Sequence, residues 1–129
     1  MRREIISSPN FPQTMGPYSH ATRAGEFIFC AGQGGVDPRT GKLVEGGIRE
    51  QTRQTIRNLQ TILEAAGSDL SHILMVTVLL HGWEYFEEMN KIFEESFGQQ
   101  PPARSTIQGE RSPEGALVAM SAIAVTKTH

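Results

Sequence analysis

Apolar residues recur with a helical period in two parts of the chain. In residues 48–66 they are spaced by three and four, which is typical of a helix with one buried face. Gly67 follows, where many helices end in a left-handed residue. A second helix is predicted at about 84–97 and ends before the prolines at 101–102, since proline cannot continue a helix. Its inner stripe consists of Phe86, Met89, Phe93 and Phe97.

Short apolar runs predict the strands. The run “FIFCAGQ” at 27–33 contains aromatic residues and is interpreted as a strand, and “SHATR” at 19–23 is expected to pair with it as a hairpin. The run “ILMVTVLL” at 73–80 is too short for most helices and predicts a strand buried on both faces. The last predicted strands are 103–108 and 116–126.

The predicted order is β-β-β-α-β-α-β-β, with a strong turn at “DPRTGK” (37–42) before the first helix. Two amphipathic helices can cover only one face of a mixed sheet of about six strands, so the fold class is α+β with two layers. In the last strand both alternating sets of side chains are apolar or small. Another subunit is the natural cover for the second face, and we therefore expect an obligate oligomer.

The composition favours an ordinary globular protein with one domain over 1–129. Of 129 residues, 38% are hydrophobic and 20% charged, and no apolar run approaches the roughly 20 residues that span a bilayer. The first residues lack the apolar core of a signal peptide, so we expect a cytoplasmic protein with no membrane partner. A net charge of −2 argues against nucleic-acid binding, and the four histidines show no metal-ligand spacing. Cys30 is the only cysteine, so an internal disulfide is impossible.

Arg104 is the most conspicuous candidate for a functional residue. It lies in “PPARST” (101–106), among small residues at the start of a predicted strand. A half-buried arginine needs an anion, because an unpaired buried charge is costly. That anion is either a ligand carboxylate or a carboxylate of a neighbouring subunit, and the local pattern leaves both open.

Several short stretches together resemble the RidA/YjgF family of small trimeric proteins, some of which are also labelled endoribonuclease L-PSP. They fall in the family's order and spacing and cover nearly the whole chain. The stretches are “GPYS” (16–19), “AGQ” (31–33), “DPRTGKLVEG” (37–46), “EQTRQTIRNLQTILEAAG” (50–67), “PPARS” (101–105) and “AIAV” (122–125).

The resemblance implies a chorismate-mutase-like subunit that forms a homotrimer, with small carboxylate substrates bound in clefts between subunits. The family's best-known members hydrolyse reactive enamines and imines, such as 2-aminoacrylate, to 2-keto acids and ammonia. In this sequence the carboxylate-binding arginine corresponds to Arg104. The other pocket residues correspond to Tyr18, the backbone of Gly32, and Asn90. Neither a metal nor another cofactor is implied.

This chain departs from the family pattern at four positions. In the family, the last strand often carries a glutamate that is thought to position or activate the attacking water, and here Ser121 takes its place. A hydroxyl is a poor general base, but we keep Ser121 together with Arg104 as the catalytic candidates. Thr106, which we keep among the substrate-binding candidates, stands where the family often has cysteine. Ala31 and Phe93 replace a serine and a tyrosine. Glu110 and Glu114, in the loop before the last strand, are weaker candidates for a substitute carboxylate.

Three functions therefore compete. The leading one is a deaminase of enamines and 2-imino acids, with weakened activity or an altered substrate because of Ser121. The second is a regulatory protein that binds a small carboxylate without turning it over. The third is an endoribonuclease, for which the sequence offers no basic stripe and few aromatic residues for base stacking.

Overall fold

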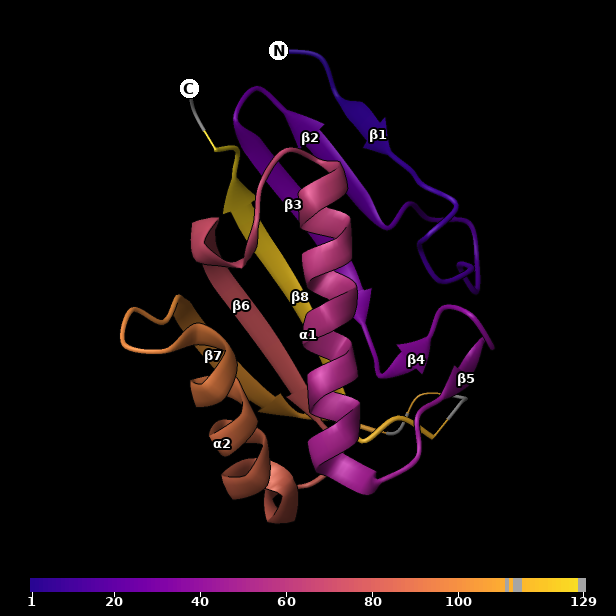
Figure 1. Ribbon diagram of the computed structural model, residues 1–129, viewed down its shortest axis with the longest axis vertical. Coiled ribbons are helices and arrows are strands. Elements are labelled where there is room, and N and C mark those ends of the chain that lie inside the picture. The colour runs from indigo at the N-terminus through magenta and orange to yellow at the C-terminus, as the bar shows by residue number, and fades with distance from the viewer. Residues whose placement is uncertain (111, 113–114, 128–129) are drawn as a thin grey trace.

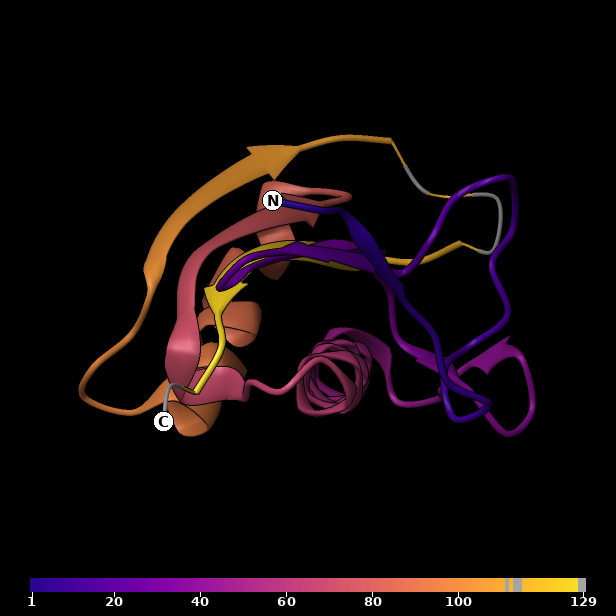
Figure 2. The ribbon, with the colours of Figure 1, turned by 90° about the horizontal axis from the view of Figure 1, so that it is seen from above.

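The computed structural model describes residues 1–110, 112 and 115–127, and it has two layers. Figure 1 shows a sheet with two helices in front of it, and Figure 2 shows that both helices lie on the same side of that sheet. The predicted α+β class is confirmed, as is the placing of both helices on one face of a six-stranded sheet.

The sheet is antiparallel except at one edge. Its strands, in spatial order, are β1 (Glu4–Ile6), β2 (Ala21–Ala24), β3 (Phe27–Gln33), β8 (Val118–Val125), β6 (Ile73–Leu80) and β7 (Ala103–Gln108). Only β6 and β7 are parallel, since α2 crosses over between them. The remaining elements are the hairpin β4 (Val36–Asp37) and β5 (Lys42–Leu43), the helices α1 (Gly47–Ala65) and α2 (Phe86–Phe97), and the short 3₁₀ turns η1 (Leu70–His72) and η2 (Trp83–Tyr85).

Most predicted elements lie within a few residues of the observed ones. The residue after the C-cap of α1, Gly67, has a φ of 86°, as expected for a left-handed helix end. The predicted second helix divides into η2 and α2, and the hairpin turn between β2 and β3 is formed by Gly25 and Glu26. The sequence pattern did not locate β1, β4 or β5, because two or three residues are too few to show a period.

The core lies between the helices and one face of the sheet. Ile56, Leu59 and Ile62 of α1 are almost completely buried, and so are Val76 and Met120 from the strands beneath them. Burying a side chain of this kind contributes roughly 1.5–3 kcal/mol relative to leaving it exposed. The apolar stripe predicted for the first helix is therefore the stripe that packs on the sheet.

The prediction that residues 73–80 are buried on both faces is wrong for this chain. Val76 and Val78 face the helices and are fully buried, whereas Leu79 on the other face is 40% exposed. The physical reason is that nothing in the described chain covers the second face of the sheet. That surface, called the open face below, carries Ile5, Phe27, Phe29, Leu79, Ile107 and Ile123.

Polar side chains of α1 fix the chain that leaves β3. The amide of Asn58 donates hydrogen bonds to the carbonyls of Gly34 at 3.0 Å and Val36 at 2.8 Å. Gly35 lies so close to α1 that an added Cβ would be 2.8 Å from the Cα of Gln51. Only glycine permits this close approach, and the hydrogen bonds from Asn58 hold the segment after β3 against the helix. Neither helix, within the described residues, is long and apolar enough to cross a membrane.

Candidate functional site

Arg104 projects from the edge strand β7 toward α2. Its register partner on β6 is Val76, a fully buried residue, so Arg104 lies on the helix-covered side of the sheet. The guanidinium carbon is 4.8 Å from the centre of the Phe93 ring and 5.8 Å from that of Phe86. Both distances are within the range of attractive cation–π contacts.

The charge of Arg104 is unpaired within the described residues. No carboxylate there lies within 4.0 Å of its guanidinium, whose nearest recorded polar contact is the Met89 sulfur at 3.9 Å. Burial lowers the pKa of Arg104 from its ordinary value because water is partly excluded. Since guanidinium stays protonated in proteins, the site retains a positive charge that an anion would stabilise.

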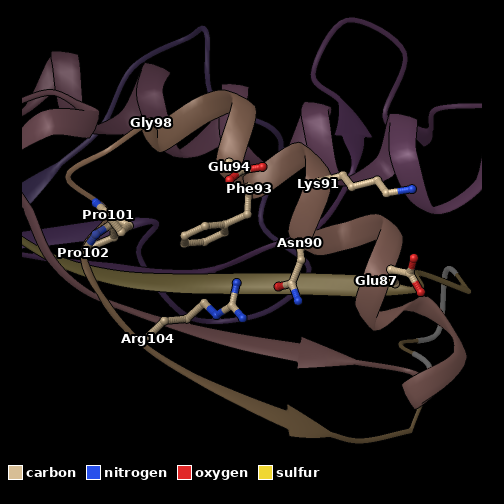
Figure 3. Close-up of a pocket in the computed structure, with 9 residues that line it drawn as sticks. All are labelled: Glu87, Asn90, Lys91, Phe93, Glu94, Gly98, Pro101, Pro102 and Arg104. Carbon is tan, nitrogen blue, oxygen red and sulfur yellow. The ribbon is translucent and has the colours of Figure 1, made fainter.

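A cavity of about 480 Å³ opens beside this guanidinium. Its lining residues are Glu87, Asn90, Lys91, Phe93, Glu94, Gly98, Pro101, Pro102 and Arg104. In Figure 3, Asn90 and Phe93 extend from α2 toward Arg104, whereas Lys91 points away from it. The Oδ1 atom of Asn90 is buried and accepts no hydrogen bond from the described residues. The cavity therefore combines a cation, a free acceptor and an aromatic wall.

Tyr18 and Gly32 line a different cavity, of about 270 Å³. Gly32 lies in β3, where the register with β8 shifts between Cys30 and Gln33. Two strands separate β3 from β7, so the two strands are about 14 Å apart at the usual inter-strand spacing. Within one chain, the predicted substrate-binding residues are thus divided between two cavities. Arg104 and Asn90 line the first, and Tyr18 and Gly32 line the second.

His20 and Gln33 organise this second cavity, and sequence analysis identified neither of them as a site residue. The buried imidazole of His20 donates from Nε2 to the Pro12 carbonyl at 2.5 Å, and its Nδ1 accepts from Gln33 at 2.9 Å. Its ring also packs edge-on against the ring of Tyr18, with 6.1 Å between centroids. These contacts join residues far apart in sequence, so no local spacing reveals them.

Ser121 lies on the opposite side of the sheet from Arg104. Its register partner is Thr77, which alternates with the buried Val76 and therefore faces the open side. Ser121 lines a hollow of about 220 Å³ there. Thr106 is aligned with the buried Val78 and so lies on the same side as Arg104, although it is not among the residues that line the Arg104 cavity.

The candidate substitute carboxylates are not at the Arg104 cavity. Glu110 lines a hollow of about 100 Å³ near His81, and Glu114 lies outside the described residues. Instead, Glu87 and Glu94 line the cavity from α2. Both are exposed, so they are residues of the rim. Among the described residues, no three His, Cys, Asp or Glu side chains are grouped to hold a metal ion.

Fold and cavity together define a class: a small α+β protein with a recess chemically suited to a small organic anion. The endoribonuclease L-PSP family matches residues 8–126. The chain belongs to this family, which is the RidA/YjgF family that the sequence motifs indicated.

Relatives extend over almost the whole chain. A RutC family protein of Pyrococcus horikoshii is 44% identical over 95% of this chain and 97% of its own. The 2-iminobutanoate/2-iminopropanoate deaminase of Mus musculus is 40% identical over 95% of this chain and 91% of its own. The crystal structure of RidA from an Antarctic Psychrobacter superposes with a TM-score of 0.90 at 31% identity, covering 95% of this chain and 98% of that one. The similarity in sequence, and for the Psychrobacter protein also in fold, therefore extends over almost the whole chain.

Proposed function

We propose that this chain is a hydrolytic deaminase of 2-imino acids and their enamine tautomers, releasing 2-keto acids and ammonia. One observation carries the proposal: Arg104 is a cation without an ion-pair partner among the described residues, and it lies in a cavity beside the free acceptor of Asn90. The mouse relative is named for 2-iminobutanoate and 2-iminopropanoate, which are small carboxylates that carry an imine. A cation and an acceptor match these two groups.

Arg104 would hold the substrate carboxylate through two parallel N–H donors, a geometry that planar guanidinium matches. The Oδ1 atom of Asn90 would accept the imine N–H and orient the C=N bond. A water oxygen then adds to the imine carbon, its two protons pass to nitrogen, and the C–N bond breaks as ammonia leaves and the ketone forms. Imines already react with water, so orientation and polarisation supply much of the required acceleration.

We further propose that the chain works as a homotrimer, with the open face buried between subunits. The exposed aromatic and aliphatic side chains of that face support self-association, since a surface of this kind is unusual on a monomer. The separation of β3 from β7 adds support. A cleft between subunits would allow Tyr18 and Gly32 of one subunit to face a ligand on Arg104 of another.

The test is hydrolysis of imines that an amino-acid oxidase generates in the assay, followed as 2-keto acid release in competition with a nucleophilic trap. Arg104→Ala should lower kcat/KM at least about a hundredfold, as expected when a charged contact to the reacting molecule is lost. Arg104→Lys keeps the charge but not the fork, and it should retain part of the activity. Equal rates for wild type and Arg104→Ala, at equal thermal stability, would remove Arg104 from the mechanism.

A non-catalytic carboxylate-binding protein is the second candidate, and the position of Ser121 favours it. Ser121 is neutral, and the sheet separates it from Arg104 within one chain. Calorimetry with a small 2-keto acid distinguishes the two functions. Binding that is lost in Arg104→Ala, without turnover of any imine by wild type, would establish the binding protein.

A further inference from the structure

The loop that carries Tyr18 joins β1 to β2, and its residues 7–20 form neither helix nor strand. A loop of this length needs fixed points if one of its side chains is to hold a defined place. Apart from the bonds of His20, the recorded hydrogen bonds of the loop join residues at most three positions apart. Among the described residues, His20 therefore ties the loop to the sheet by hydrogen bonds.

Gly32 lies where β3 lacks the support of its neighbour strand. The recorded pairing with β8 passes from Cys30 to Gln33, so Ala31 and Gly32 take no part in that ladder. On the other side, the N–H of Ala31 donates to the carbonyl of His20 at 2.8 Å. The side-chain amide of Gln33 donates to the carbonyl of Ala31 at 3.2 Å. Gly32 is exposed, but both of its neighbours in the chain are held by this network.

The hydrogen atoms of the network fit in one arrangement. A carbonyl only accepts, so the Gln33 amide presents its nitrogen to Ala31, and the same nitrogen lies 2.9 Å from Nδ1 of His20. Nδ1 must then accept, which places the ring proton on Nε2, where the Pro12 carbonyl accepts it. His20 and Gln33 are 8% and 3% exposed, so little water competes for these bonds. A buried network in which every donor has its acceptor is rigid.

We infer that His20 is a positioning residue of the site, which acts together with Gln33 and does not itself touch the substrate. It holds Tyr18 by closing the loop and by ring packing, with 6.1 Å between the ring centroids. It holds the backbone of Gly32 through the residues on either side. This inference rests on the proposed function, in which Tyr18 and Gly32 face a ligand bound to Arg104 of another subunit.

The test compares two replacements of His20 in the imine hydrolysis assay. Glutamine offers a donor and an acceptor, whereas phenylalanine keeps a ring and has neither. His20→Phe should lower kcat/KM at least about tenfold, since a displacement of about 1 Å of a positioning group can cost about a hundredfold. His20→Gln should restore most of the activity and lose no more than about threefold. Equal losses in the two variants, at equal thermal stability, would contradict the role of the hydrogen bonds.

Gln33→Met is a second variant that removes the same network from its other end. Methionine keeps the length and volume of the side chain and cannot donate. It should lower kcat/KM as much as His20→Phe, and it decides the question if His20→Phe does not fold. His72→Phe is the matched control, because His72 lies 2.6 Å from Asp69 in the turn before β6 and lines neither cavity. It should keep wild-type kinetics.

A double variant separates positioning from a contribution to stability alone. In a Tyr18→Ala background, His20→Phe should lower kcat/KM by about threefold or less, because the side chain that it positions is already absent. An undiminished loss in that background would overturn the inference. Wild-type kinetics for both His20→Phe and Gln33→Met would also overturn it, while leaving the proposed function intact. No acceleration of any imine by the wild-type protein would overturn both.

Discussion

The two sides of the sheet carry hollows of different size and chemistry, about 480 Å³ beside Arg104 and about 220 Å³ beside Ser121. On the helix side, Arg104 lies in a cavity with an aromatic wall and a free amide oxygen. On the open face, Ser121 of β8 lies in a smaller hollow beside Phe29 and Ile123. The first place suits a small anion, because it combines charge with partial burial. The second suits another protein surface, since large apolar groups surround its few hydroxyls.

This contrast assigns different tasks to the two sides. Replacing a residue of the open face should first affect assembly, and replacing a residue of the cavity should first affect substrate turnover. Phe29 and Arg104 are the residues on which the contrast depends most, because Phe29 is the largest side chain of the hollow around Ser121 and Arg104 supplies the partly buried cation of the cavity.

The largest effect is expected for a charge on the open face. Phe29 is 48% exposed in the chain and would be buried by a neighbouring subunit. Phe29→Glu should abolish self-association, because a buried unpaired carboxylate costs several kcal/mol. Light scattering should then give the subunit mass of 14.2 kDa, whereas wild type should give three times that mass.

The control for this experiment is Gln60→Glu, on the solvent-exposed surface of α1, which should keep the wild-type mass. Circular dichroism establishes that both variants remain folded. A wild-type protein that scatters as a single chain at micromolar concentration would contradict the proposed trimer, and the open face would then need another explanation.

A smaller effect is expected for the acceptor in the cavity. Asn90→Ala removes the free Oδ1 beside Arg104, so the imine loses its orienting partner while the carboxylate anchor remains. Loss of one such contact typically lowers kcat about a hundredfold, and KM should change much less. Steady-state kinetics with the best imine measure this.

The matched control is Glu95→Ala, because Glu95 lies on the same helix and does not line the cavity. Wild-type kinetics for Asn90→Ala would mean that the Asn90 oxygen does not orient the imine. A rise in KM alone would assign Asn90 to binding of the ground state rather than to the transition state.

The elements on each side were predictable to different degrees. Periodicity within one segment located α1 and its buried stripe, because the helix is 19 residues long and its eight buried residues recur at helical spacing. Alternation also showed that the last strand is apolar on both sides. It did not show which set of its side chains shares a side with Arg104, because that depends on the register of β8 on β6 and of β6 on β7.

Contacts between distant segments account for the other omissions. Motif resemblance grouped Arg104 with Ser121, although the sheet separates them within one chain. The stacking of Arg104 on Phe93 depends on how α2 packs over β7, and the hydrogen bond from Gln33 to His20 joins two strands. Neither leaves a local signal in the sequence. The trimer and the roles of the substrate-binding residues remain predictions.

The smallest effect is expected for Ser121 itself. Its hydroxyl belongs to a row across the open face in which Thr77 is the register partner of both Ser121 and Ser105. If the reaction takes place at the cavity of one chain, Ser121→Ala should change kcat/KM by no more than about twofold, as for a residue that does not contact the reacting molecule. Ser105→Ala, in the same row, is the control. A tenfold loss of kcat/KM in Ser121→Ala but not in Ser105→Ala, with assembly intact, would contradict this expectation. It would indicate that Ser121 of one subunit lies against the ligand on Arg104 of its neighbour. The two sides of the sheet would then contribute to one site.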